Sequence, residues 1–334
     1  MRHHSATAAL LAAAVLGGLG LVPGAAHART GPAVARAAWI KSCYDKKEGD
    51  SRPCGHWRLL RSDGTQATVR DAAITKIDAA GKEVRDSGTF AISADGKVLA
   101  YERAGDHRLV VRRVAGGPAT VLPKSVVPKG IGTDEIGVDL SPRGDKILID
   151  YLDDPSRLPA KVVTVVTGKI ITLPADDTML GFSGDGDEVL ATRYQGDNTT
   201  AMHAYPLDGG APIKSTPPQV VANALAHALA PDGKTVATFT AGDPETKQPP
   251  RVRIYDLETG DLSASGDLPV KPGAVPYAPY WTADGRLDVV VHSGEDGMPA
   301  VIRVLTVDPE TREATQADKY TISKTRYAYF AAGE

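Results

Sequence analysis

Aspartates recur along the chain where a short apolar run gives way to a polar loop. They are Asp106, Asp154, Asp197, Asp243 and Asp296. Carboxylates gathered from several loops could bind Ca²⁺, another cation or a basic segment of a partner protein. An aspartate beside glycine, as at Gly105-Asp106, also builds a turn by hydrogen-bonding its own backbone. The pattern favours this turn role, so no cofactor is expected, with Ca²⁺ as the alternative.

Two further sets of side chains could contact a ligand. Asp139 lies within an apolar run, where a carboxylate could point into an internal channel. Tyr277, Tyr280 and Trp281 are close in sequence and would suit a peptide or a sugar if exposed. Because aromatic side chains in strands are usually buried, packing inside the fold is the favoured interpretation of this cluster.

Catalysis receives little support from the sequence. The histidines beyond residue 28 are scattered and form no H-E-x-x-H motif; they are His56, His107, His203, His227 and His292. The segment Gly181–Asp185 resembles a nucleophile elbow but ends in aspartate and lies in a strand–turn–strand pattern. We therefore assign no catalytic residue and no metal ligand.

Cys43 and Cys54 are the only two cysteines. In an exported chain, an even pair most often forms a disulfide. The spacing matches neither a C-x-x-C redox motif nor a zinc site. We expect a disulfide that fastens an N-terminal arm to the domain that follows.

A repeat positions these residues. Each unit has a strand, a tight turn, a second strand and two further strands, all short and bounded by glycine, aspartate or proline. The turn glycines are spaced 48, 42, 47 and 52 residues apart; they are Gly96, Gly144, Gly186, Gly233 and Gly285. Four-stranded units at about 40–50 residues per repeat are typical of β-propeller blades.

The turns themselves resemble those of the TolB-type, WD-repeat-like β-propeller family, whose repeat carries a Ser-Pro-Asp-Gly-Lys turn. The matching segments are Ser93–Lys97, Ser141–Gly144, Ala230–Lys234 and the outer turn Leu257–Gly260. The resemblance covers roughly residues 57–331. It implies the fold and is consistent with a binding role, but a fold hosts many functions.

The ends of the chain decide the number of blades. Residues 56–60, 67–71 and 74–78 look like strands before the first clear repeat, and 325–330 looks like a strand after the last. Joining a C-terminal strand to the N-terminal strands closes a ring without exposed sheet edges. We predict six blades over residues 56–334, with seven as the alternative if residues 31–85 hide a blade.

The N-terminus has the pattern of a secretory signal. Arg2 precedes the apolar stretch 8–22, and Ala26-His27-Ala28 is a small-x-small cleavage site. We expect residues 1–28 to be removed after Ala28 by a Sec-type route, leaving residues 29–55 as an arm and no membrane span. The net charge of −3 lacks the basic excess typical of a nucleic-acid binder.

The loops on the two faces of the predicted propeller indicate where a partner could bind. The turns between strands one and two, and three and four, are tight and share one face. The longer loops share the other face, and binding residues concentrate on loops carried by a rigid scaffold. We predict a secreted, monomeric, non-catalytic propeller that binds a protein or peptide partner. The alternatives are a propeller enzyme (a metal-dependent lyase or a lactonase-type hydrolase) and a carbohydrate-binding module.

Overall fold

The computed structural model describes residues 33–152, 158–294 and 297–334. These residues belong to one compact unit, Pro32–Glu334. The expected signal peptide, the first residues of the expected arm, Asp154 and Asp296 lie outside the described residues. None of the helices in the described ranges has the length and apolar character needed to cross a bilayer.

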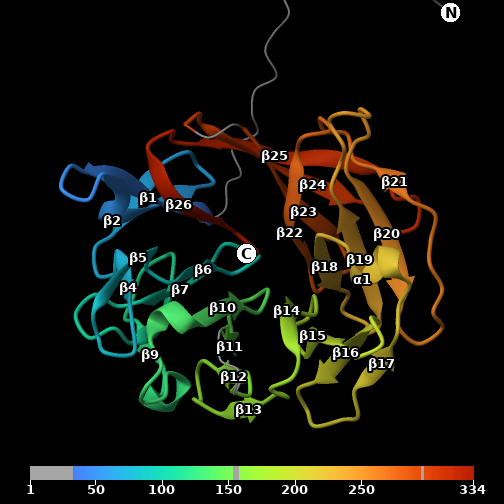
Figure 1. The fold of residues 1–334 in the computed structure, drawn as a ribbon, viewed down its shortest axis with the longest axis horizontal. Coiled ribbons are helices and arrows are strands. Elements are labelled where there is room, and N and C mark those ends of the chain that lie inside the picture. The colour runs from blue at the N-terminus through green and yellow to red at the C-terminus, as the bar shows by residue number, and fades with distance from the viewer. Residues whose placement is uncertain (1–32, 153–157, 295–296) are drawn as a thin grey trace, which may run out of the picture. The chain divides into compact units, whose positions relative to one another are not determined.

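Six four-stranded antiparallel sheets are arranged around a common centre, which confirms the six-bladed β-propeller (Figure 1). The closing blade has the order β26-β1-β2-β3, with β1 (Ala35–Asp45), β2 (Asp50–Arg61), β3 (Gln66–Val69) and β26 (Arg326–Ala331). Strand β26 pairs with β1 from Ala37 opposite Ala331 to Lys41 opposite Arg326. The C-terminal strand therefore joins the N-terminal strands in the closing blade, as expected, and takes the innermost place there.

The other five blades each use four consecutive strands, numbered from the centre outward. Blade 2 contains β6 (Phe90–Ile92), β7 (Val98–Glu102), β8 (Leu109–Arg113) and β9 (Thr120–Val121). Blade 3 contains β10 (Ile136–Leu140), β11 (Lys146–Tyr151), β12 (Lys161–Thr164) and β13 (Ile170–Thr172). Blade 4 contains β14 (Thr178–Phe182), β15 (Glu188–Tyr194), β16 (Thr200–Pro206) and β17 (Ile213–Ser215).

Blade 5 contains β18 (Ala226–Leu229), β19 (Thr235–Thr240), β20 (Arg251–Asp256) and β21 (Gly266–Asp267). Blade 6 contains β22 (Val275–Trp281), β23 (Leu287–Ser293), β24 (Ala300–Val307) and β25 (Ala314–Ile322). The connections between blades carry a hairpin and three short helices: β4 (Thr75–Ile77), β5 (Glu83–Ser87), η1 (Lys124–Val126), η2 (Thr133–Glu135) and α1 (Gln219–Ala222).

The turn between the first two strands explains the sequence repeat. The Ser93 hydroxyl donates to Asp95 at 2.7 Å and accepts the N–H of Val98 at 3.0 Å. Ser141 and Ser183 likewise accept the N–H five residues ahead. The following glycine has a positive φ, +68° at Gly96 and +70° at Gly144, which residues with a side chain rarely adopt. The serine and the glycine therefore fix the geometry of the turn.

The blades have two faces, defined by their connections. The turns between strands one and two, and three and four, lie on what we call the tight-turn face. The connections between strands two and three, and between blades, lie on the long-loop face. The hairpin β4–β5 and the helices η1, η2 and α1 belong to this second face because they join successive blades.

Strand β1 corrects the expected N-terminal arm. Residues from Ala35 onward form a central strand of the closing blade rather than a loose segment. Ala37, Ala38 and Ile40 are 0% exposed between β26, β2 and the neighbouring blades. Alanine has low intrinsic β-propensity, but packing against neighbours decides strand formation, and small side chains fit a crowded position.

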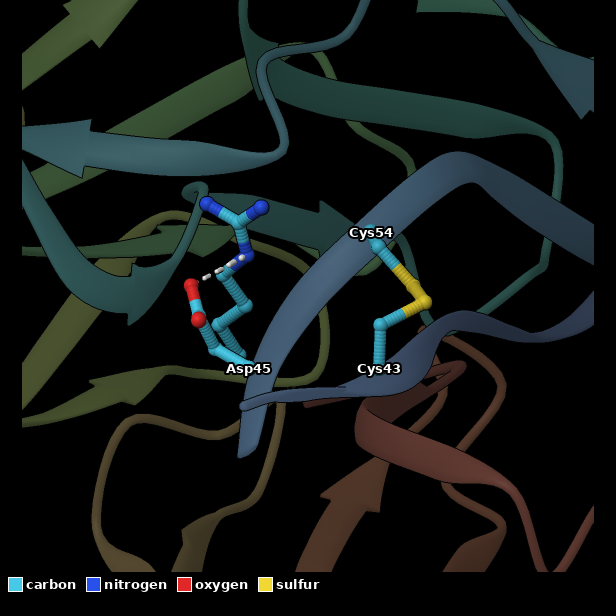
Figure 2. Close-up of a disulfide and its surroundings, with 4 residues drawn as sticks. Cys43, Asp45 and Cys54 are labelled. Carbon is cyan, nitrogen blue, oxygen red and sulfur yellow. Dashed lines mark ion pairs between the residues drawn. A yellow bond between two sulfur atoms is a disulfide. The ribbon is translucent and has the colours of Figure 1, made fainter. Parts of the chain in front are cut away.

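The Cys43–Cys54 disulfide lies in the hairpin formed by β1 and β2, with the two Cα atoms 5.9 Å apart (Figure 2). It therefore joins two strands of one blade instead of fastening an arm to the propeller. Next to it, Arg52 forms an ion pair with Asp45 at 3.6 Å. The hairpin tip is also held to β5, where Arg85 contacts Asp50 at 3.0 Å.

Candidate functional site

The recurring aspartates on the long-loop face build their own loops. Asp106 binds the Arg103 guanidinium, with Nε at 2.9 Å from Oδ1. Asp197 accepts hydrogen bonds from the backbone and hydroxyl of Thr199, at 3.1 and 2.6 Å. Asp243 accepts from Glu245 N at 2.8 Å and from Thr246 Oγ1 at 2.7 Å. The turn role therefore describes these three residues.

The pKa shifts of these three aspartates agree with the turn role. The hydrogen bond from Arg103 is the main cause that lowers the pKa of Asp106 to about 2. Hydrogen bonds from Thr199 and Thr246 lower the pKa of Asp197 and of Asp243. Across residues 33–152, 158–294 and 297–334, no group of three or more His, Cys, Asp or Glu side chains is arranged to hold a metal ion. The three carboxylates do not converge on one site.

Tyr277, Tyr280 and Trp281 have different surroundings in the structure. Trp281 is 5% exposed, and its indole Nε1 donates to Ala228 O in the neighbouring blade at 3.2 Å. Tyr277 is half-buried and packs edge-on against Tyr329, with ring centroids 6.3 Å apart. Tyr280 lines the central channel. The three rings therefore offer no shared aromatic platform for a sugar.

Asp139 does line the central channel. It borders a cavity of about 70 Å³ together with His227, Tyr280 and Glu334. The cavity lies at the tight-turn end of the channel, because its walls come from the last residues of the innermost strands and the turns after them, such as Pro142. This separates Asp139 and Tyr280 from the aspartates of the long-loop face. The volume holds about two water molecules.

The acids of the channel titrate near neutral pH. Desolvation, helped by the nearby Asp150 carboxylate, raises the pKa of Asp139 to about 6. Burial raises the pKa of Glu334 to about 7, and Asp139 adds to this shift. His227 Nε2 donates to Val221 O at 2.8 Å, and burial lowers the pKa of His227. The channel therefore gains negative charge as the pH rises from about 5 to about 8.

Blade 4 contains a buried polar network that the sequence did not predict. Asp177, 1% exposed, is contacted by Arg193, His203 and Tyr205. Burial alone would raise the pKa of Asp177, but hydrogen bonds from Tyr205, His203 and Arg193 outweigh it and the pKa is lowered. Asp177 immediately precedes β14, and the other three residues lie in β15 and β16, so no local spacing reveals them. Full pairing of a buried charge is typical of a structural network.

Exposed apolar side chains gather on the long-loop face. In the part of the chain that the structure describes, eight large hydrophobic side chains are exposed. Only Val166, in the β12–β13 turn, belongs to the tight-turn face. The other seven lie at strand ends or connections of the long-loop face: Tyr44, Leu152, Tyr194, Val220, Leu225, Val275 and Met298. None of these seven side chains was among the candidate residues chosen from the sequence.

Comparison with known proteins yields structural similarity alone. No family model matches the chain. No curated protein matches it in sequence. Among solved structures, TolB from Acinetobacter baumannii is 15% identical with a TM-score of 0.49, over 90% of this chain and 67% of that one.

Two further solved structures share the architecture. The nidogen/laminin complex is 11% identical with a TM-score of 0.47, over 89% of this chain and 98% of that one. An oligogalacturonate lyase in complex with manganese is 15% identical with a TM-score of 0.43, over 86% of this chain and 75% of that one. The chain is thus similar in structure to TolB-like and other β-propellers at low identity, and this similarity concerns the fold.

Proposed function

We propose that this chain is a secreted, non-catalytic β-propeller that binds a protein or peptide partner through its long-loop face. The observation that carries the proposal is the one-sided distribution of exposed apolar side chains. Soluble monomers expose single hydrophobic residues anywhere, but a concentration on one face is typical of an interaction surface.

Three of the seven exposed side chains of this face belong to blade 4 and to its connection with blade 5. Tyr194, 68% exposed, ends β15, and Leu225, 52% exposed, immediately precedes β18. Val220 on α1 lies in the same connection between the two blades. Tyrosine supplies a large contact area with a polar end, and such residues often dominate the binding energy of an interface. We therefore assign the centre of partner binding to this region.

The two alternative functions have less support. A channel enzyme needs room for a substrate beside Asp139 and His227, and the cavity of about 70 Å³ is smaller than typical ligand pockets of ~300–1,000 Å³. A sugar platform needs stacked exposed rings, whereas Trp281 is buried between blades.

The test uses immobilised chain, residues 29–334, and extracts of the culture supernatant and cell envelope of the source organism. A captured protein is identified, purified, and its affinity measured by calorimetry. We expect Tyr194→Ser with Leu225→Ser to weaken binding at least tenfold. Val166→Ser is the matched control, because Val166 is 88% exposed on the opposite face and its loss should leave affinity unchanged. Weakening by the Val166 variant alone would place the interface on the tight-turn face and reject the proposal.

A further inference from the structure

A second, larger cavity lies on the long-loop face of blade 2. Its volume is about 450 Å³, and it lies between the β7–β8 loop and the connection from β9 to β10. The wall is mainly apolar, formed by Leu109, Leu122, Val126, Val127 and Ile131. A volume in the range of ~300–1,000 Å³ with mostly apolar walls and a few polar groups is typical of small-molecule sites.

His107 is the first polar group in this wall, and a buried carboxylate orients it. Its Nδ1 lies 2.5 Å from Oε1 of Glu102, which is 0% exposed. Burial raises the pKa of Glu102, although hydrogen bonds with His107 and Thr133 oppose this shift. Because Nδ1 is engaged, Nε2 is the ring nitrogen left for a ligand, and it donates to an anion when it carries the ring proton.

The backbone of His107 is also held in an unusual conformation. Its φ of +53° lies in the left-handed region, which costs free energy for a residue with a side chain. Such conformations persist where the surroundings impose them, and they cluster at functional sites. Here the conformation turns the imidazole back toward Glu102 at one edge of the cavity.

Arg108 and Lys124 give the cavity its charge. One Arg108 nitrogen donates to Leu122 O, while its buried Nε has no hydrogen-bond partner within the described residues. Lys124 lies on the opposite side, in η1. Asp106 also lines the cavity, but both its oxygens are held by Arg103. Among the described residues that line the cavity, Arg108 and Lys124 carry positive charge and form no ion pair, and a guanidinium matches a carboxylate.

We propose that this cavity binds a small organic acid with an apolar body and one carboxylate. The carboxylate is placed between the Arg108 guanidinium and His107 Nε2, and the apolar body against Ile77, Val127 and Ile131, which are only partly buried. The binding does not depend on the partner protein of the proposed function, because it uses a cavity beside blade 2 rather than the exposed side chains of blades 4 and 5.

The experiment titrates octanoate into the folded chain by calorimetry. We expect one site with a Kd below 1 mM, on the order expected for a ligand of this size. Octan-1-ol, with the same tail and no charge, and acetate, with the charge and no tail, should each bind at least tenfold more weakly. Equal binding of octanol would remove the role of the cationic groups and overturn the proposal.

Variants locate the site. Arg108→Gln should weaken octanoate binding at least tenfold, whereas Arg113→Gln, an exposed arginine at the other end of β8, should leave it unchanged. His107→Asn keeps a residue type that tolerates positive φ and should also weaken binding. As a readout without any variant, the ¹⁵N resonance of His107 Nε2 should shift on octanoate addition. An unshifted resonance with bound octanoate would reject the site.

One more experiment distinguishes a free small acid from the C-terminal carboxylate of a peptide. A tripeptide with an apolar last residue is titrated with a free and with an amidated C-terminus. Octanoate binding well while both peptides bind weakly supports the free acid. Binding of the free-carboxylate peptide without octanoate binding would overturn the assignment to a small acid and indicate a chain terminus instead.

Discussion

The backbone of Gly333 lies against the ring of Tyr280 at the centre of the propeller. A Cβ built at Gly333 would lie 2.3 Å from Tyr280 Cδ1, and φ at this glycine is +90°. Gly333 N also donates to Ile92 O in blade 2 at 3.0 Å. The segment after β26 therefore contacts blade 2 and blade 6 at the same time. These contacts lie outside the strand pairing within the blades.

We predict that Gly333→Ala is strongly destabilising. The methyl group cannot fit without moving Tyr280, and overpacking of this kind costs about 1–3 kcal/mol in addition to backbone strain. Gly116→Ala is the control, since Gly116 has φ +103° but nothing within 4 Å of a Cβ. Chemical denaturation of both variants measures the difference. Equal losses of unfolding free energy would show that the contact with Tyr280 contributes nothing.

The interface between blades 2 and 3 gives a second prediction. Gly144 and Gly285 occupy the same turn position, with φ of +70° and +81°. A Cβ at Gly144 would lie 2.4 Å from Val98 Cβ, whereas a Cβ at Gly285 meets nothing within 4 Å. Gly144→Ala should therefore lower the unfolding free energy by about 1–3 kcal/mol more than Gly285→Ala. A melting series on both variants checks this, and a larger loss at Gly285 contradicts it.

Stability should depend on pH through Asp139. Its pKa is raised to about 6 in the folded chain, above the ordinary value of 3.8, so the folded state binds the proton more tightly than the unfolded state. Its contribution is therefore favourable below about pH 4 and is lost as the pH rises through about 6. Asp139→Asn should raise the unfolding free energy by about 1–2 kcal/mol at pH 8 and by little at pH 4.

Asp197 provides a control of opposite sign. Hydrogen bonds within its own turn lower its pKa, so its contribution is present above about pH 4 and lost at lower pH. Asp197→Asn should therefore lower stability at pH 8 and leave it unchanged at acidic pH. Urea denaturation at pH 2, 4, 6 and 8 compares both variants with the parent chain. A gain for Asp139→Asn that is the same at every pH would point to packing instead of ionisation.

The sequence predicted the parts of the fold that repeat. The serine and glycine of each turn act within about five residues, so their spacing reports the hairpins directly. The closing strand was also predictable, because an unpaired edge needs a partner. Strand β1 was not predicted, because its alanines give no alternating pattern and its burial comes from β26, almost the whole chain length away.

The candidate sites were less predictable, for a related reason. Asp177 and Tyr205 meet although 28 residues separate them. His107 and Glu102 are close in sequence, but their contact depends on a positive φ that nothing in the local sequence requires. Likewise, Tyr194 and Tyr101 both lie at or next to the end of a strand, but Tyr194 is exposed and Tyr101 is buried. Packing between blades causes this difference in exposure, and the local sequence does not show it.

The disulfide gives the last prediction, which concerns local rather than global stability. Strand β1 pairs with β26 only as far as Lys41, and β2 pairs with β3 only from Trp57 onward. Beyond these points the hairpin is two-stranded and is fastened by the disulfide and by Arg85. Lys46 and Lys47 lie at its tip.

We expect Cys43→Ser with Cys54→Ser to accelerate trypsin cleavage at Lys46 and Lys47 at least tenfold, because local opening frees the tip without opening the sheet. The melting temperature should change little: a disulfide that closes so short a loop contributes at most about 3 kcal/mol, and these strands are already paired. Arg85→Gln, which removes only the contact with β5, should accelerate cleavage less. A large fall in melting temperature with cleavage throughout the chain would instead mean that the hairpin holds the closing blade together.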